Sequence, residues 1–339
     1  MTLMSLFRPL TPQEMAGWTI RIYRQYWPRW IGLAAMAVLP PLALNLALSA
    51  SQTETLDPAL LDEVMRSLER GLMPDEATLQ ALTQGLVRLV AITLGMLAVT
   101  LLFQAVLLSG AGAVLASGAY HGRAVALADG LRAALGERFG PLVGGHAAVG
   151  GVLVGLLIAS FLTLTLCVGI FGLGVTAYVY LAWFPLLAPV LALERGRVGV
   201  LMRRAWYFGK KRIWLLFGAV AAFLLVRVAA LIAAALLSSL VGLILPAGAA
   251  TWADVLLFAT GQVIVLPLEA IFYTLLYEDT CSRFDPALLS PAASAGPEAT
   301  APAEPFLTAA DLPNLAMVSM AALSLLFLLS LLLLPFSPF

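Results

Sequence analysis

Residues 194–214 decide how this chain is organised, and they read ERGRVGVLMRRAWYFGKKRIW. Apolar runs too long for an ordinary core helix lie on both sides of this stretch. Lys and Arg next to membrane spans are retained on the cytoplasmic side of a membrane. The sequence therefore predicts a cytoplasmic basic loop between two spans, with seven charges that fix the topology: Arg195, Arg197, Arg203, Arg204, Lys210, Lys211 and Arg212.

The composition of the whole chain agrees with membrane insertion. Hydrophobic residues make up 61% of it and charged residues 11%, whereas roughly a quarter of an ordinary soluble domain is charged. An ordinary soluble fold is thereby excluded, and an all-α polytopic transmembrane bundle is predicted. The two cysteines, Cys167 and Cys281, offer neither a disulfide framework nor a metal cluster. We expect them at opposite membrane faces.

Seven apolar runs reach or exceed the length of about 20 residues that crosses a bilayer. Pro40 and Pro41 fall within the first run and should kink the helix or end its regular part. In the third run, small residues recur every four positions and should let another helix approach closely: Ala147, Gly151, Gly155 and Ala159. The predicted spans cover about residues 30–49, 86–117, 142–168, 170–193, 213–245, 253–277 and 315–334.

The first six spans form one predicted membrane domain, residues 1–285, which begins with an amphipathic helix. Thr11 as N-cap, Pro12 at the first position and Glu14 three residues after the cap mark the start of this helix. We expect it to lie at the membrane surface; the alternative is a plain lead-in to the first span. One of its faces carries Trp18, Ile22, Tyr26 and Trp30.

Two polar segments interrupt the apolar runs. Residues 50–85 are acidic and poor in Lys and Arg, so they are expected outside, with an amphipathic helix around residues 60–68. Residues 286–313 are rich in Pro and Ala and are predicted to be a disordered linker. This linker would allow the last span, within residues 314–339, to act as a peripheral anchor that packs through bulky, nonspecific contacts.

Alternation of the spans then gives a complete topology. With the basic loop inside, the amino terminus is cytoplasmic and the carboxyl terminus is outside. Fifteen of the nineteen Lys and Arg residues fall in inner segments. The expected location is therefore the inner (cytoplasmic) membrane of a cell, as a multi-pass protein.

The basic segments also suggest an internal repeat. Arg and aromatic positions of residues 21–29 match those of residues 204–212 at one fixed offset, each copy followed by a Trp and an Ile, and residues 130–142 are a looser third copy. The sequence thus favours three parallel helical-hairpin repeats followed by a carboxyl-terminal span. The alternative is that any inner loop before a span is basic and aromatic.

Short motifs resemble a known family. The segments RPLTP (residues 8–12) and WTIRIYRQYW (18–27), LERGRVGVLMRRAW (193–206) and LLYED (275–279) are similar to uncharacterised bacterial membrane proteins grouped with the membrane domain of glycerophosphoryl diester phosphodiesterases. The soluble phosphodiesterase domain of that enzyme has no counterpart in this sequence. The resemblance, over about residues 5–285, therefore implies a membrane domain and does not imply hydrolysis.

Motifs for catalysis are weak throughout the sequence. The two histidines, His121 and His146, have no Cys or carboxylate nearby at metal-ligand spacing. Gly110 and Gly112 resemble the start of a dinucleotide loop, but Leu115 stands where the third glycine would be, so we read them as helix packing. We expect no enzyme activity, cofactor, metal or nucleic-acid partner; topology accounts for the basic charge.

One polar cluster is predicted inside the bilayer. Arg227 lies near the middle of the fifth span, and Gln262 and Glu269 share one face of the sixth. A charge at that depth is costly and usually faces protein or water. We expect Arg227 to reach Gln262 directly and Glu269 partly or through water. Such a cluster either locks two helices together or forms a polar point in a substrate or ion path.

Three classes of function follow. The favoured hypothesis is a non-enzymatic integral membrane protein that assembles with or supports other membrane components. Its expected partners are the lipid bilayer and either other membrane proteins or further copies of itself. The alternative is a transporter or permease with a polar point at Arg227, and the third is a membrane enzyme acting on lipid.

Overall fold

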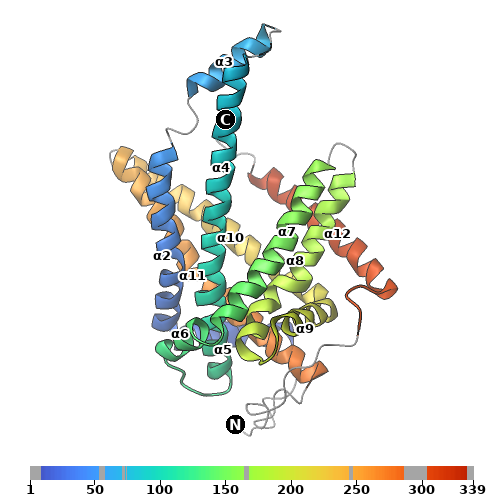
Figure 1. Ribbon diagram of the computed structural model, residues 1–339. Helices are drawn as coiled ribbons and strands as arrows, with labels where there is room; N and C mark the ends of the chain where they lie inside the picture. The colour runs from blue at the N-terminus through green and yellow to red at the C-terminus, as the bar shows by residue number, and fades with distance from the viewer. Residues whose placement is uncertain are drawn as a thin grey trace. The chain divides into compact units, whose positions relative to one another are not determined.

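The computed structural model describes residues 9–52, 58–70, 73, 75–163, 168–243, 247–285 and 304–333. Within these ranges all regular structure is helical (Figure 1). Six of the described helices are long and apolar enough to cross a membrane, and a shorter apolar stretch, Ala309–Leu325, lies near the carboxyl end. The all-α class is confirmed, and six of the seven expected spans reach full length in the described residues.

The helices follow one another in the order predicted from the apolar runs. Their bounds are α1 Pro12–Gln25, α2 Trp27–Gln52, α3 Pro58–Glu69, α4 Glu76–Phe103, the π-helix η2 Gln104–Ala111, α5 Gly112–Tyr120, α6 Leu127–Leu135, α7 Phe139–Leu162, α8 Val168–Leu193, α9 Val198–Lys211, α10 Ile213–Gly242, α11 Ala247–Phe284, the 3₁₀ turn η6 Ala309–Asp311 and α12 Leu312–Leu333.

The chain divides into two compact units, residues 35–104 and residues 1–34 with 105–339. In the smaller unit α3 packs against α4, and α3 is the amphipathic helix expected around residues 60–68. Helix α2 continues through Pro40 and Pro41. The expectation that these prolines end its regular part is therefore wrong, because a long helix tolerates the loss of single backbone hydrogen bonds.

The start of α1 is the one predicted from its capping residues. Thr11 accepts a hydrogen bond from the Glu14 backbone N–H, and the Glu14 carboxylate accepts one from the Thr11 backbone N–H. This capping box satisfies two backbone donors that a helix end otherwise leaves unpaired. Met15, Thr19 and Ile22 are buried where α1 packs against α5 and α11.

Helices α8 and α11 form the centre of the larger unit. Helix α8 packs against α7, α9, α11 and α12, and α11 packs against α1, α5 and α10. The burial of the most apolar part of each span agrees with this arrangement: 50% of it is buried in α8 and 39% in α11, but only 17% in α7 and 6% in α10. The rest of the described chain therefore leaves most of the apolar surface of α7 and α10 uncovered.

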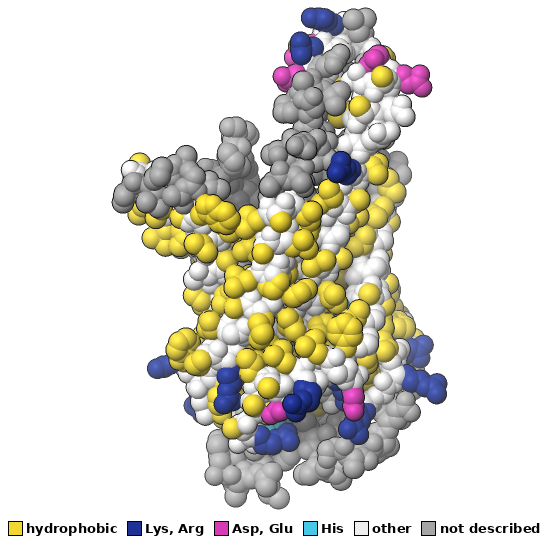
Figure 2. All heavy atoms as spheres, turned by 60° about the vertical axis from the view of Figure 1, so that its left-hand side comes forward, with side chains coloured by type: hydrophobic (Ala, Val, Ile, Leu, Met, Phe, Trp, Pro, Cys, Tyr) yellow, Lys and Arg dark blue, Asp and Glu magenta, His cyan; other side chains and the backbone are white. Residues whose placement is uncertain are grey.

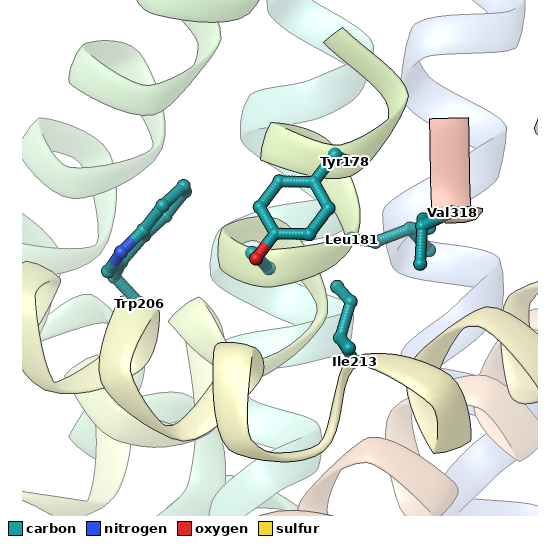
Figure 3. Packing of buried hydrophobic residues seen from close by; sticks show 6 residues of the cluster. Tyr178, Leu181, Trp206, Ile213 and Val318 are labelled. Atoms are coloured by element: carbon teal, nitrogen blue, oxygen red, sulfur yellow. The ribbon is translucent and has the colours of Figure 1, made fainter. Parts of the chain in front are cut away.

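Most of the basic stretch of residues 194–214 forms a helix, α9, and not an open loop. Gly209 allows the backbone of α9 to lie directly against the carbonyl of Ala182 in α8. The Trp183 indole N–H donates to the carbonyl of Met202 at 2.9 Å. Buried residues from α8, α9, α10 and α12 meet there in one cluster (Figure 3): Tyr178, Leu181, Ala182, Trp206, Ile213 and Val318.

The predicted stripe of small residues on α7 does not pack within the described chain. Helix α7 turns a different face to α8, with Gly145 against Leu191 and Ser160 against Gly172. The predicted stripe is exposed instead at all four positions, and no described atom comes within 4 Å of a Cβ built on Gly151 or Gly155. The glycines at residues 110 and 112 do pack, since a Cβ on Gly112 would lie 3.5 Å from Ala270.

The segment before α12 corrects two expectations. Residues 286–303 of the predicted linker 286–313 lie outside the described residues, but residues 304–313 are structured, so the expected disorder does not hold for them. The Trp206 indole N–H donates to the carbonyl of Phe306 at 2.6 Å, and Lys210 Nζ donates to Asp311 Oδ2 at 2.8 Å. Helix α12 crosses α8 (Figure 1), with Ser319 against Gly174, so its packing is specific and not only bulky.

The tether between α9 and η6 yields a prediction. The side chains of Lys210 and Asp311 are only 4% and 15% exposed, so Asp311→Asn leaves a buried ammonium without its charged partner. We expect this change to lower the free energy of unfolding by roughly 2 kcal/mol, measured by thermal unfolding in detergent. The matched control is Glu304→Gln, which breaks the exposed pair with Lys211 and should cost below about 1 kcal/mol.

The same tether should respond to acid. Burial alone would raise the pKa of Asp311, but hydrogen bonds from Lys210 and Thr308 outweigh it and hold that pKa below its usual value. A lowered pKa stabilises the fold above the unfolded value, and this contribution is lost as the pH falls through the folded value. Asp311→Asn should therefore remove part of the wild type's acid sensitivity. Equal losses of stability in Asp311→Asn and Glu304→Gln would contradict this account of the tether.

Candidate functional site

The intramembrane cluster is centred on one ion pair between α10 and α11. Arg227 Nε donates to Glu269 Oε1 at 2.6 Å, and its terminal nitrogen donates to Oε2 at 2.7 Å. Both donors of one guanidinium edge are thus engaged by both oxygens of one carboxylate. This two-pronged geometry is the strongest that Arg and a carboxylate form, so the pair holds the two helices in one register.

Gln262 belongs to the same region but not to the pair. It lines a partly open hollow with Arg227 and apolar residues of both helices. The structure therefore reverses the expected order, since Arg227 bonds directly to Glu269 and only shares a hollow with Gln262. The side chain of Arg227 is 35% exposed.

A second polar cluster lies at the end of the larger unit that carries α9, here called the basic end. Arg204 Nε lies 2.6 Å from Glu194 Oε2, and a terminal nitrogen of Arg204 donates to Asp285 Oδ2 at 3.0 Å. The Tyr277 hydroxyl donates to the other oxygen of Glu194 at 3.1 Å. Arg204 and Glu194 are only 5% and 4% exposed. This network ties α9 and the end of α8 to α11.

The electrostatics of this network follow from its burial. Burial raises the pKa of the Glu194 carboxyl, and the charge and hydrogen bond of Arg204 act in the opposite direction. Burial also works to lower the pKa of Arg204, but Glu194 and Asp285 outweigh it and the pKa is raised. Arg138 donates to the backbone carbonyl of Glu194. Burial, followed by repulsion from Arg195, lowers the pKa of Arg138.

Asp279 joins the amino-terminal segment to the same end of α11. Its Oδ2 accepts hydrogen bonds from Arg212 at 2.7 Å and Arg283 at 3.0 Å, and its Oδ1 accepts one from the backbone N–H of Leu10 at 2.7 Å. The carboxylate has 0% exposure. One buried acid therefore fixes three separate segments, so we interpret it as a structural junction.

The two histidines occupy helix-packing positions. The His146 ring contacts Phe184 edge to face at 5.6 Å, and its Nδ1 lies 2.7 Å from the carbonyl of Leu142. His121 Nδ1 lies 3.9 Å from the carboxylate of Glu278, which accepts a 2.5 Å hydrogen bond from Ser117. Glu278 is only 5% exposed. The carboxylate is thus buried, whereas the His121 side chain is 25% exposed and its Nδ1 lies 2.8 Å from the carbonyl of Ser117.

Sequence reasoning missed these networks at the basic end. It treated the seven basic residues as topology signals alone, although Arg204, Lys210, Lys211 and Arg212 are all in ion pairs. A usable signal was present in the cluster of acids at the end of α11, Glu278, Asp279 and Asp285. Three acids at the end of an apolar helix need partners, and two of them, Asp279 and Asp285, pair with Arg212 and Arg204.

The arrangement of charge and apolar surface defines the class of protein. Figure 2 shows a broad surface of hydrophobic side chains with many Lys and Arg side chains along its lower edge. With six membrane-length apolar helices, the chain is a multi-pass helical integral membrane protein. No family model, curated protein or solved structure matches this sequence. The resemblance to the membrane domain of glycerophosphoryl diester phosphodiesterases thus has no support from a family match.

Proposed function

We propose that this protein is a non-enzymatic integral membrane protein that assembles with another membrane helix, from a second copy or from another protein. The observation that carries the proposal is the surface of α7. This span buries only 17% of its most apolar part, and the face that it leaves outside holds Ala147, Gly151, Gly155 and Ala159. Small residues allow close approach of helix backbones in a membrane, where packing drives association.

Cysteine cross-linking in native membranes tests the proposal. In a variant without Cys167 and Cys281, Gly155→Cys should form a cross-linked species, which is a dimer if the partner is a second copy and a heteromeric adduct if it is another protein. The control is Leu157→Cys, which is exposed on the same helix but off the stripe. Equal cross-linking at the two positions would overturn the proposal.

The polar cluster supports the same proposal in a different way. Arg227 and Glu269 engage each other through two hydrogen bonds, which is the arrangement expected of a brace between spans. One observation favours a transporter as the second candidate, the hollow that Arg227 and Gln262 line. Ala230 lines that hollow, so a cysteine introduced by Ala230→Cys reports whether water reaches it. Rapid labelling of this cysteine by a membrane-impermeant thiol reagent would favour the transporter.

We also propose an orientation for the bundle in a bacterial inner membrane. The basic end faces the cytoplasm, the amino terminus lies inside and the carboxyl terminus lies outside. The support is the distribution of charge, because fifteen of the nineteen Lys and Arg residues fall in segments that alternation places on one side.

A further inference from the structure

A second hollow lies at the basic end, between the junction of α1 and α2 and the end of α5. It contains about 220 Å³ of empty space, part of it open to the surroundings. Two arginines and two aromatic residues line it beside three apolar ones: Arg29, Arg123, Tyr26, Trp30, Leu115, Ala119 and Val125. It is separate from the hollow at Arg227 and from the ion-pair networks of α9.

The first cation is positioned by the backbone opposite. Arg29 donates one hydrogen bond to the carbonyl of Val125 at 2.7 Å, and its guanidinium lies 5.0 Å from the centre of the Tyr26 ring. These contacts fix the plane of the group. A guanidinium has five N–H donors, and among the described residues only this one hydrogen bond of the Arg29 side chain is found. Further donors can therefore serve a ligand.

The second cation comes from the turn after α5. Gly122 adopts a left-handed φ of +72°, which a glycine takes without strain. The chain then turns back, and the backbone N–H of Arg123 bonds to the carbonyl of Gly118 at 2.8 Å. The Arg123 side chain is exposed, and no ion pair of it is found in the described part of the chain. Two arginines thus line a single hollow.

An independent polar group points to a ligand there. Trp30 is 1% exposed, and its indole N–H has no hydrogen-bond acceptor among the described residues. A buried N–H without a partner is costly and calls for an explanation. Two other indoles do find carbonyl acceptors, those of the partly buried Trp183 and the buried Trp206. An acceptor held in the hollow would explain why the Trp30 indole lacks one.

The charge of the hollow favours an anion with several acceptor oxygens. The nearby carboxylate of Glu278 is 5% exposed and already accepts a hydrogen bond from Ser117, so it does not project into the hollow as a ligand. Arg favours phosphate because its planar donors match the oxygens. The apolar side chains of Leu115 and Ala119 also line the hollow. They can contact the carbon atoms that are bonded to a phosphate group through its ester oxygens.

We infer that this hollow binds a phosphate group, carried by the headgroup of a phospholipid at the basic end of the bundle. Arg29 and Arg123 supply the charge, and the Trp30 indole donates a neutral hydrogen bond. Tryptophan and arginine are also the residues that sit at headgroup level in membrane proteins. The site is independent of the association proposed for α7, so either can fail without the other.

Lipid binding by the purified full-length protein tests this inference. The probes are short-chain phosphatidylglycerol, the same concentration of a short-chain diacylglycerol without phosphate, and inorganic phosphate. Native mass spectrometry counts bound lipid, and thermal unfolding in detergent reports stabilisation. Arg123→Gln and Trp30→Phe should each weaken phosphatidylglycerol binding, Arg123→Gln by about tenfold, the effect of one lost charge-assisted hydrogen bond.

The matched control is Arg24→Gln, which removes the same charge from an exposed position of α1 that does not line the hollow. Unfolding of each variant without lipid separates loss of the site from loss of the fold. If inorganic phosphate displaces phosphatidylglycerol, the site recognises the phosphate group itself and also binds the free anion. Equal binding by Arg123→Gln, Trp30→Phe and Arg24→Gln, or equal binding of diacylglycerol, would overturn the inference.

Discussion

Replacing Arg204 with alanine is expected to lower the free energy of unfolding by roughly 3 to 5 kcal/mol. Its partner Glu194 is 4% exposed and would remain buried with only the Tyr277 hydroxyl as a side-chain donor among the described residues. Breaking one side of a buried pair is costly because the remaining charge has lost its solvation and its partner. Thermal and denaturant unfolding in detergent measure the loss.

The neighbouring arginine supplies the control. Arg203 is exposed and lies 5.4 Å from the Phe306 ring, so Arg203→Ala should cost no more than about 1 kcal/mol. Adding Glu194→Gln to Arg204→Ala should recover part of the loss, because a neutral amide is cheaper to bury than a carboxylate. If Arg203→Ala and Arg204→Ala destabilise the protein equally, the network does not hold the basic end together.

The Arg204 variant should also change how stability depends on pH. Burial already raises the pKa of Glu194, and Arg204 is the main influence against it. Without Arg204 that pKa should rise further, so that the folded protein binds a proton that the unfolded chain does not. A group with a raised folded pKa stabilises the fold below that value and loses this effect as the pH rises. The variant should therefore lose less stability at acidic pH than at neutral pH.

The second large effect is expected inside the membrane. Arg227→Ala should lower the free energy of unfolding by roughly 3 kcal/mol or more, since Glu269 is 15% exposed and would face an apolar region without its two donors. The double variant Arg227→Met with Glu269→Gln should recover much of this, because it removes both charges. Arg132→Ala is the control, because its pair with Asp129 is 83% and 58% exposed and should contribute below about 1 kcal/mol.

A double-mutant cycle gives the coupling between the two residues. The loss in the double variant should be smaller than the sum of the single losses by at least about 1 kcal/mol, since the residues are in direct contact. Strict additivity would mean that the bidentate contact contributes nothing to the fold. Full water accessibility of Arg227 in membranes would also contradict its role as a brace.

The sequence predicted those features that depend on local pattern. The approximate positions of six spans follow from apolar length, and the start of α1 follows from Thr11, Pro12 and Glu14. The approach of Arg227 to Glu269 could be anticipated because both residues are charged, lie in adjacent spans and have few other partners. Each of these features depends on residues that are close in sequence or on one strong physical requirement.

Features that depend on three-dimensional convergence could not be predicted in the same way. Two of the hydrogen bonds on Asp279 come from residues 10 and 212, which no periodicity connects to it, whereas the one from Arg283 has ordinary i,i+4 helical spacing. The docking of α12 depends on the fit of Ser319 against Gly174, which composition does not reveal. The outward direction of the α7 stripe follows from which face packs on α8, and the sequence offers small residues on both faces. The predicted three-fold repeat stays a prediction.

Reporter fusions test the central claim, that the basic stretch of residues 194–214 fixes the orientation of a multi-pass bundle. One reporter active only in the cytoplasm and one active only outside are each fused after Arg212 and after Asp62. The account predicts cytoplasmic signal after Arg212 and outside signal after Asp62, because the basic residues of the first segment stay inside. A cytoplasmic signal after Asp62, or an outside signal after Arg212, would contradict the topology and with it the proposed orientation of every span.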